Sequence, residues 1–339
     1  MTTKEIKNKC FKYFIYSILA WDHKDRKVED DPKDACYFFS PEYKKSFTKD
    51  LEIARKKNII KIEYLGNDAT STNFNIYEKN DGEVIIAFRG SDSKIDWGAD
   101  FAYFKQKFKE ENNEKLFTMS GEDFNKLCME EYKKSREDLF DKPIKFFSEA
   151  FKTDLASFAD NIAIKNNFDI SNYGLFLKSV FEKYKSRIEF HGGFIRQYKS
   201  IYVELNKIVD KYMSDKRFKK IIFCGHSLGS ALAMDSYILQ SIRYPENNFE
   251  CYAAGTPKIG NIILAKFIKE SKLGEKMFIM NIENDLVSYV PPEKLGFFKP
   301  VNDVEITPLK APFNTKMNHT LFYYLYCIKN FAPVKVNPK

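Results

Sequence analysis

The sequence lacks several features that would identify common classes of protein. No apolar stretch approaches the roughly 20 residues that a membrane-spanning helix needs. Only four histidines occur, and none has a histidine or cysteine partner at metal-ligand spacing, so no metal site is expected. No organic cofactor is expected either. The six cysteines have no dense spacing, and Cys224 and Cys251 are predicted to be reduced and buried. No compact basic motif occurs, which disfavours a nucleic acid as partner.

The composition is that of a folded protein with a substantial core. The chain has 339 residues, of which 44% are apolar, and its net charge is +8. Length alone suggests about two domains, although single α/β domains of this size are common. Most of the lysines are predicted to lie on solvated faces. The alternative is that the positive charge attracts the protein to an anionic surface such as phospholipid headgroups.

The N-terminal stretch "KNKCFKYFIYSILAW" (7–21) has a superficial likeness to an export signal. Lys12 interrupts its apolar part, and no clean cleavage site follows it. We therefore interpret the stretch as an amphipathic helix. A cytoplasmic or peripheral-membrane location is expected on this basis, with secretion left open.

Strands and helices alternate over much of the chain, which predicts an α/β fold with a mostly parallel sheet and helices on both faces. Residues 80–82 ("NDG") indicate a hairpin turn, and the continuous apolar run 83–90 is typical of a buried central strand. Strands are predicted at 58–66, 72–90, 219–225, 249–255 and 276–285, and helices at 196–213 and 231–242.

Residues 101–190 have a different pattern, because their apolar residues fall at helical spacing and no strand is indicated. Examples are Phe147, Phe151, Leu155, Phe158 and Ile162, and a second set comprises Tyr173, Phe176, Val180 and Tyr184. A long helical insertion is predicted here.

The pentapeptide "GHSLG" (225–229) places Ser227 between two glycines, after an apolar run and before small residues. A nucleophile at the tip of a sharp strand-to-helix turn is strained, and side chains two residues away on either side would collide there. Glycine removes that collision. The backbone N–H groups of the following helix would favour a developing oxyanion. The motif and its context predict a nucleophilic serine.

A serine hydroxyl needs a base, and in α/β-hydrolases the order along the chain is serine, acid, histidine. His319 is the only histidine after Ser227, so it is the candidate base. Asp285, which follows a predicted strand, is the candidate acid. Glu283 is its main rival, Asp303 is a weaker one, and Asp235 in the helix after the serine is poorly placed.

Several segments in matching order resemble the class 3 lipases, the fungal-type triacylglycerol lipase family of α/β-hydrolases. They are "VIIAFRGSDSKIDWGADF" (84–101), "FHGGF" (190–194), "GHSLGSALA" (225–233), "AAGTPKIGN" (253–261), "IENDLVSYVPP" (282–292) and "NHT" (318–320). The resemblance covers roughly 84–101 and 190–320. It implies an α/β-hydrolase fold with a helical lid.

Carried over by position, the resemblance implies that Ser227 is the nucleophile, Asp285 the acid and His319 the base. It also implies that the oxyanion is held by backbone N–H groups of Ser91 and Leu228. His191 and His226 match positions that the family uses structurally. Arg89, Asp96, Trp97 and Asp100 match a segment that organises the oxyanion loop through hydrogen bonds.

Three departures from the family pattern stand out. Ser230 replaces a frequent glycine, and Lys258 replaces a frequent arginine. The third departure is the length of 101–190, which exceeds that of the corresponding interval in the compact fungal enzymes. The expected organisation is core helices and first strands in 1–100, a helical lid or cap in 101–190, and the remaining core in 191–339. A structural helical subdomain without a gating role is the alternative for 101–190.

The expected activity is hydrolysis of carboxylic esters of lipids, on triacylglycerol or monoacylglycerol or in the manner of a phospholipase A1. The expected partners are a lipid or other ester substrate and a lipid interface contacted through 101–190. Two alternatives remain open. One is a carboxylesterase for small or aryl esters, and the other is a non-catalytic lipid-binding protein of the same fold.

Overall fold

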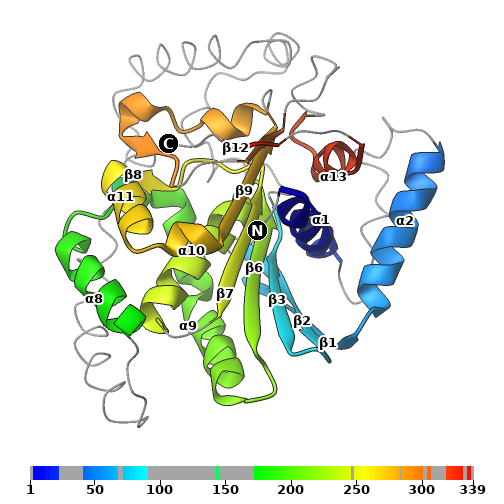
Figure 1. Cartoon of the computed structure of the whole chain (residues 1–339), viewed down its shortest axis with the longest axis horizontal. Coiled ribbons are helices and arrows are strands. Elements are labelled where there is room, and N and C mark those ends of the chain that lie inside the picture. Colours follow the sequence, from blue (N-terminus) through cyan, green and yellow to red (C-terminus); the bar gives the residue numbers. More distant parts are fainter. Residues whose placement is uncertain are drawn as a thin grey trace.

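A computed structural model describes most of the core of the chain (Figure 1). The described residues are 3–22, 41–67, 72–90, 143–144, 172–245, 248–282, 285–300, 304–306, 318–330 and 334–336. The predicted cap, 101–190, therefore lies mostly outside the described residues, and its role as a lid stays a prediction. Ser91, Asp96, Trp97, Asp100, Glu283 and Asp303 also lie outside them.

The described core is built on an eight-stranded sheet with the order β1-β2-β3-β6-β7-β9-β11-β12. Strands β3, β6, β7, β9 and β11 are parallel to one another, and antiparallel strands flank them on both sides. The strands are β1 (Ile59–Asn67), β2 (Thr72–Lys79), β3 (Glu83–Phe88), β6 (Lys220–His226), β7 (Phe249–Ala254), β9 (Met277–Ile282), β11 (Val304–Ile306) and β12 (Val334–Val336).

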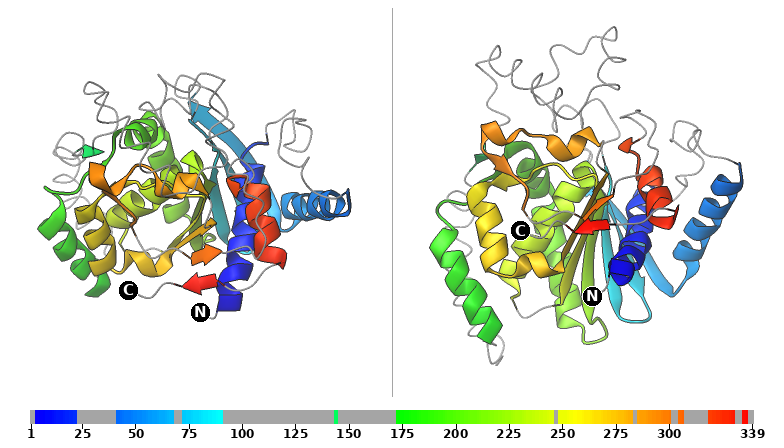
Figure 2. Two further views of the ribbon diagram at one scale, coloured as in Figure 1. Left: turned by 90° about the horizontal axis from the view of Figure 1, so that it is seen from above. Right: turned by 45° about the horizontal axis from the view of Figure 1, so that its top comes forward.

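Helices cover both faces of this sheet (Figures 1 and 2). One face carries α8 (Asn172–Tyr184), α9 (Gly192–Ser214), α10 (Leu228–Arg243) and α11 (Ile262–Glu270). The opposite face carries α1 (Thr3–Leu19), α2 (Pro41–Lys56) and α13 (Leu321–Asn330). Short 3-10 helices lie at η6 (Leu273–Lys276), η7 (Leu286–Tyr289) and η8 (Glu293–Leu295).

The central strands have continuous apolar sequences because both of their faces are buried. In β3, Val84 and Ile86 belong to the hydrophobic cluster beneath α9 and α10, whereas Ile85 and Ala87 belong to the cluster beneath α1 and α13. Successive residues of a strand point to opposite faces, so one run of sequence supplies two cores. The central strand predicted over 83–90 is thus confirmed, as are the hairpin at 80–82 and the parallel sheet with helices on both faces.

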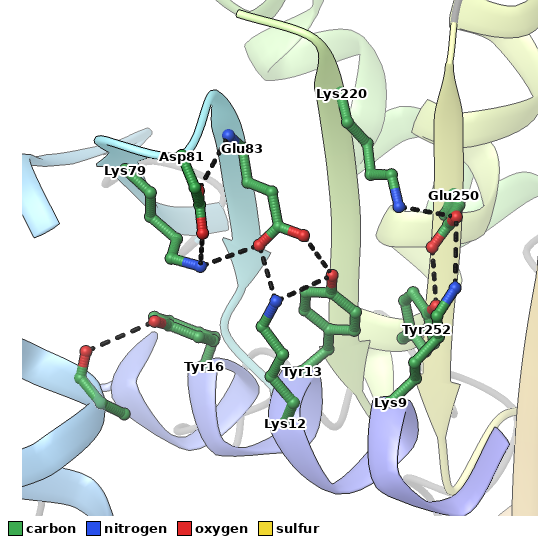
Figure 3. A network of polar contacts seen from close by, with 11 residues as sticks. Lys9, Lys12, Tyr13, Tyr16, Lys79, Asp81, Glu83, Lys220, Glu250 and Tyr252 are labelled. Atoms are coloured by element: carbon green, nitrogen blue, oxygen red, sulfur yellow. Dashed lines mark hydrogen bonds and ion pairs between the residues drawn. The ribbon is translucent and has the colours of Figure 1, made fainter. Parts of the chain in front are cut away.

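Helix α1 is more deeply buried than an amphipathic surface helix. Every residue from Tyr13 to Ala20 is buried, because α1 packs between the sheet on one side and helices α2 and α13 on the other. Figure 3 shows how its polar side chains are bound at the amino-terminal ends of the strands. Lys12 and Tyr13 bind the carboxylate of Glu83 at 2.7 and 2.8 Å. The helix is therefore part of the core. Among the described helices, none is long and apolar enough to cross a membrane.

A second, small sheet was not predicted. It has the order β10-β8-β5-β4, with strands β10 (Phe297–Phe298), β8 (Gly260–Asn261), β5 (Phe190–His191) and β4 (Pro143–Ile144). Strand β4 lies inside 101–190, so the prediction that this insertion contains no strand is wrong. Each strand has only two residues, which is too short for a period of two to be visible in sequence.

Helix α8 is confirmed, but its buried face differs from the predicted one. Leu177, Val180, Phe181 and Tyr184 join the larger core cluster, whereas Tyr173 and Phe176 are more than a third exposed. The stripe that packs on the core therefore begins one turn later than the sequence pattern indicated. Through it, the C-terminal part of 101–190 belongs to the main core.

Candidate active site

Ser227 lies on the sharp turn between β6 and α10, in a conformation that few residues adopt. Its φ is 57° and its ψ is −127°. The two flanking glycines are required by close backbone contacts. A Cβ on Gly225 would lie 2.0 Å from the carbonyl oxygen of Gly229, and a Cβ on Gly229 would lie 2.4 Å from the carbonyl oxygen of Phe88. This is the collision that the sequence predicted at a nucleophile turn.

Three side chains from distant parts of the chain meet at this turn. The Nε2 atom of His319 lies 2.8 Å from the Oγ of Ser227, and the Nδ1 atom lies 2.9 Å from Oδ2 of Asp285. Ser227 follows β6, Asp285 follows β9, and His319 lies two residues before the start of α13. Carboxyl ends of parallel strands share one edge of a sheet, so the fold places the serine and the acid side by side.

Asp285 is fully buried, and donors surround its carboxylate. Oδ1 accepts the N–H of Val287 at 2.9 Å, because Asp285 caps η7. Oδ2 accepts the phenol of Tyr324 at 2.6 Å, and that phenol oxygen accepts the N–H of Ile282 at 3.1 Å. Burial and the neighbouring carboxylate raise the pKa of Tyr324 well above its usual value, so the phenol remains a donor.

Sequence reasoning missed Tyr324. The residue lies in α13 five positions after His319, within a run of tyrosines and apolar residues that has no distinguishing pattern. Its only signal was proximity along the chain to the candidate base. Tyr324 is needed because a buried carboxylate with few donors is costly, and its phenol supplies a bond that neither η7 nor His319 makes.

Of the three rival acids, the described residues include Asp235 alone. Asp235 is buried in α10, and neither of its carboxylate oxygens has a hydrogen-bond partner among the described residues. Burial raises the pKa of Asp235 well above its ordinary value, which favours the neutral acid. Glu283 and Asp303 lie outside the described residues.

The N-terminus of α10 lies at the same turn, directly after Ser227. Leu228 is the first residue of this helix, and the first N–H groups of a helix have no acceptor within it. The carbonyl of Ser227 accepts bonds from the N–H groups of Ser230 and Ala231. The N–H of Leu228 therefore has no intrahelical acceptor and lies beside the nucleophile, as expected for an oxyanion donor. Arg89 is buried at the end of β3 with its guanidinium 5.3 Å from the ring of Trp21.

The two mild departures from the family pattern both have a structural role. The hydroxyl of Ser230 donates to the backbone carbonyl of Ser227 at 2.5 Å. The ammonium of Lys258 is buried and donates to the carbonyls of Tyr289 and Pro291 at 2.7 and 3.1 Å. Lys258 thus holds the loop that begins at Asp285.

The remaining histidines behave differently from each other. His191 caps α9, because its Nδ1 accepts the N–H groups of Gly193 and Phe194, and its ring stacks on Phe194. Its structural role is confirmed. His226 directly precedes the serine, and its ring lies 4.6 Å from that of His319. Burial, followed by the charge of His319, lowers the pKa of His226 well below its usual value.

Comparison with known proteins agrees with this geometry. The family model for lipase (class 3) matches residues 162–295, which contain the serine turn and the acid loop. This part of the chain belongs to the class 3 lipase family. A secreted mono- and diacylglycerol lipase of Malassezia globosa is 32% identical over 119 residues, or 35% of this chain. A lipase of Rhizopus niveus is 28% identical over 32% of this chain.

The match to these relatives is partial. The chain spans 39% of the length of the Malassezia protein and 28% of that of the Rhizopus lipase. Solved structures of fungal lipases match over a much larger part of the chain. The match to the Rhizomucor miehei lipase propeptide complex includes all of this chain and 83% of the solved chain. Its TM-score is 0.52, and the two sequences are 15% identical. A fungal lipase–inhibitor complex gives the same TM-score at 17% identity. That match includes 90% of this chain and 81% of the solved chain. The chain has the α/β-hydrolase fold.

Proposed function

We propose that this class 3 lipase family member hydrolyses carboxylic esters of lipids, with Ser227 as nucleophile, His319 as base and Asp285 as acid. The observation that carries the proposal is the unbroken series of contacts from the hydroxyl of Ser227 through both nitrogens of His319 to the carboxylate of Asp285. A base within hydrogen-bond reach of the nucleophile, itself oriented by a third group, is the arrangement that activates a serine.

In the proposed reaction, the Oγ of Ser227 attacks the ester carbonyl while His319 takes its proton. Negative charge then develops on the carbonyl oxygen, and the N–H of Leu228 donates to it. Ser91 is the proposed second donor. The tetrahedral intermediate collapses, the C–O bond to the alcohol breaks, and His319 returns the proton to the leaving alcohol. Water repeats the sequence on the acyl-enzyme, releasing the acid and the free serine.

Acylglycerols are the proposed substrate class. Several curated relatives are named as mono- and diacylglycerol lipases. The family model for lipase (class 3) matches the segment that holds the serine and the acid loop. Hydrolysis of triacylglycerol, of phospholipid at a charged interface, or of small and aryl esters uses the same machinery. A panel of esters that vary in chain length and headgroup separates these possibilities.

The proposed location also follows the relatives. They are named as secreted proteins, which favours export of this chain and gives no support to the cytoplasmic location expected from its sequence. Cell fractionation with an antibody to the chain tests this part of the proposal.

The test of the proposed function is the Ser227→Ala variant. We expect it to keep the melting temperature of the wild type within a few degrees while losing at least about 1,000-fold in kcat for a monoacylglycerol or a p-nitrophenyl ester. Ser214→Ala, on the exposed end of α9, is the matched control and should keep full activity. Ester hydrolysis that persists in purified Ser227→Ala protein would disprove the nucleophile assignment.

A fluorophosphonate probe separates the enzyme from its non-catalytic alternative. Covalent capture of the probe at Ser227 in the wild type, and its absence in Ser227→Ala, supports the hydrolase. A wild type that binds lipid but neither captures the probe nor cleaves any ester of the panel would be the lipid-binding protein.

A further inference from the structure

The proposed reaction assigns no role to His226, although its side chain contacts the candidate base. It ends β6 and directly precedes Ser227 in the chain, yet its side chain packs against the base and not the nucleophile. Its ring centroid lies 4.6 Å from that of His319, with 34° between the planes, and 5.9 Å from that of Tyr324 in an edge-on arrangement. One side chain therefore touches both the candidate base and the residue that binds the candidate acid.

Burial lowers the pKa of His226, and the charge of His319 lowers it further, whereas the backbone of His319 acts in the opposite direction. The Nε2 atom of His226 is buried and has no hydrogen-bond partner among the described residues. Contacts with two rings therefore fix the orientation of the His226 side chain.

The far side of the His226 ring is closed by Gly255. A Cβ at Gly255 would lie 3.0 Å from Nε2 of His226 and 3.0 Å from Oδ2 of Asp285. A larger residue at 255 would therefore have to push the histidine or the acid aside by a few tenths of an ångström. His226, His319, Tyr324 and Asp285 therefore form one continuous packed group in which a movement of one ring displaces the next.

We propose that His226 is a positioning residue for the hydrolase reaction, which holds the ring of His319 so that Nε2 stays on the hydroxyl of Ser227. This inference rests on the proposed function. The contact between the two rings restricts the rotation of the His319 side chain.

The contact becomes stronger as the reaction proceeds. His319 gains a positive charge as it removes the proton from Ser227. The neutral ring of His226 then faces a cation, and a π face near a cation is attractive. An interaction that is stronger in the transition state than in the ground state raises kcat and leaves KM nearly unchanged.

The experiment compares three variants for ester hydrolysis. His226→Ala, which removes the ring, should lower kcat by about 100-fold, the loss expected when a catalytic group is misplaced by about 1 Å. His226→Asn keeps a planar side chain next to the ring of His319 and should recover part of that loss, to about 10-fold. KM should stay within about twofold in both.

His191→Asn is the matched control. His191 is also buried and aromatic-packed, and asparagine can replace it as the cap of α9. We expect this variant to change the melting temperature and not kcat. If His226→Asn and His226→Ala kept the kcat of the wild type, or lost only stability as His191→Asn does, the positioning role would be overturned.

A proton NMR measurement keeps this test separate from that of the proposed function. The low-field signal of the Nδ1 proton that His319 shares with Asp285 should be present in the wild type and in Ser227→Ala, and should be broadened or lost in His226→Ala. A wild type without esterase activity would contradict the proposed function, while the signal would still report whether His226 orients His319. An unchanged signal in His226→Ala would contradict the positioning role, even in an active enzyme.

Discussion

Single residues at the serine edge of the sheet adopt conformations that only close packing maintains. Ser227 has a positive φ, which costs a residue with a side chain of the order of 1 kcal/mol or more, and the surrounding strands must offset that cost. Gly255, near Asp285 and His226, also has a positive φ. Its φ is +55°, and it leaves just enough space for the buried acid and His226. Strain and tight packing therefore coincide at the place where chemistry is proposed.

The first prediction at this scale concerns Gly255→Ala. Its new Cβ would lie 3.0 Å from Oδ2 of Asp285 and 3.0 Å from Nε2 of His226, so both side chains must move by a few tenths of an ångström. We expect a loss of about 1 to 2 kcal/mol in the free energy of unfolding, from the left-handed backbone, and a fall of about 10-fold or more in kcat. Denaturant unfolding and steady-state kinetics measure the two effects.

Gly82→Ala is the matched control for Gly255→Ala. Gly82 also has a positive φ, 88°, and an added Cβ would lie 2.9 Å from the carbonyl oxygen of Arg217. It lies in the turn between β2 and β3, at the end of the sheet away from Ser227. Comparable destabilisation without a change in kcat is expected. An equal loss of kcat in the two variants would mean that Gly255 acts only through stability.

At the scale of elements, the site depends on a loop and a helix that hold each other. The loop from Asp285 to Pro291 contains η7, which the carboxylate of Asp285 caps by accepting the N–H of Val287. Helix α13 supplies Tyr324 to the same carboxylate. Lys258, in the segment after β7, donates its buried ammonium to two carbonyls of this loop, so a third element fixes the position of the acid.

A second prediction follows for Lys258→Met. Methionine has a similar length and no donor, so the carbonyls of Tyr289 and Pro291 would lose the ammonium of Lys258. Each lost partner of a buried polar group costs about 1 to 3 kcal/mol, and we expect a total destabilisation of about 2 to 4 kcal/mol. The loop would loosen at Asp285, and kcat should fall with it. Lys258→Arg, which keeps several donors, should retain most of the free energy of unfolding and most of kcat. Equal losses in Lys258→Met and Lys258→Arg would contradict this role.

Much of the fold could be predicted from the sequence because its signals are local. Buried parallel strands read as continuous apolar runs, and β3, β6, β7 and β9 were all predicted near their observed bounds. Glycines at 225 and 229 predicted the serine turn because the collision that they avoid involves only a few neighbouring residues. The chain order of serine, acid and histidine led to the three side chains that meet in the structure, and their catalytic roles remain predictions.

The rest could not be predicted because it arises between elements. Tyr324 binds Asp285 from a position 39 residues away, and no periodicity marks it among neighbouring tyrosines. The small sheet of two-residue strands is held by tertiary pairing alone. Helix α1 has the sequence of an amphipathic helix, but its second face is covered by α2 and α13, whose positions depend on the whole chain. Each of these features depends on contacts that a local window does not contain.

At the scale of the whole molecule, the two ends of the sheet carry different chemistry. The carboxyl ends of the strands hold the proposed site, whereas the amino ends hold the ion-pair network of Figure 3. There Lys12, Lys79 and Tyr13 all bind Glu83 at distances between 2.7 and 2.9 Å. Glu250 accepts bonds from Lys220 and Tyr252 in the same way. This network binds α1 to the sheet at the end opposite the site, so it can be altered without touching the proposed chemistry.

The last prediction is that this network makes stability depend on acid pH. Burial alone would raise the pKa of Glu83, but the bonds from Lys12, Lys79 and Tyr13 outweigh burial and lower it from 4.5 to about 2. A carboxyl whose pKa is lower in the folded state stabilises the fold above pH 4.5, and that contribution is lost as pH falls from 4.5 toward 2. After allowance for solvent screening, about 1 to 2 kcal/mol is expected at pH 7.

Glu83→Gln tests this, because every other group titrates equally in both proteins and cancels in their difference. That includes Asp235, which acts in the opposite direction, since its raised pKa makes the fold more stable as pH falls. The difference in free energy of unfolding between wild type and Glu83→Gln, measured by denaturant at several pH values, should shrink steadily below pH 4.5. Glu52→Gln, on the exposed face of α2, should differ from the wild type by less than about 0.5 kcal/mol throughout. If the difference in free energy of unfolding between wild type and Glu83→Gln stayed constant from pH 7 to pH 2, the charge of Glu83 would not contribute to stability. The network would then stabilise the fold through packing and hydrogen bonds alone.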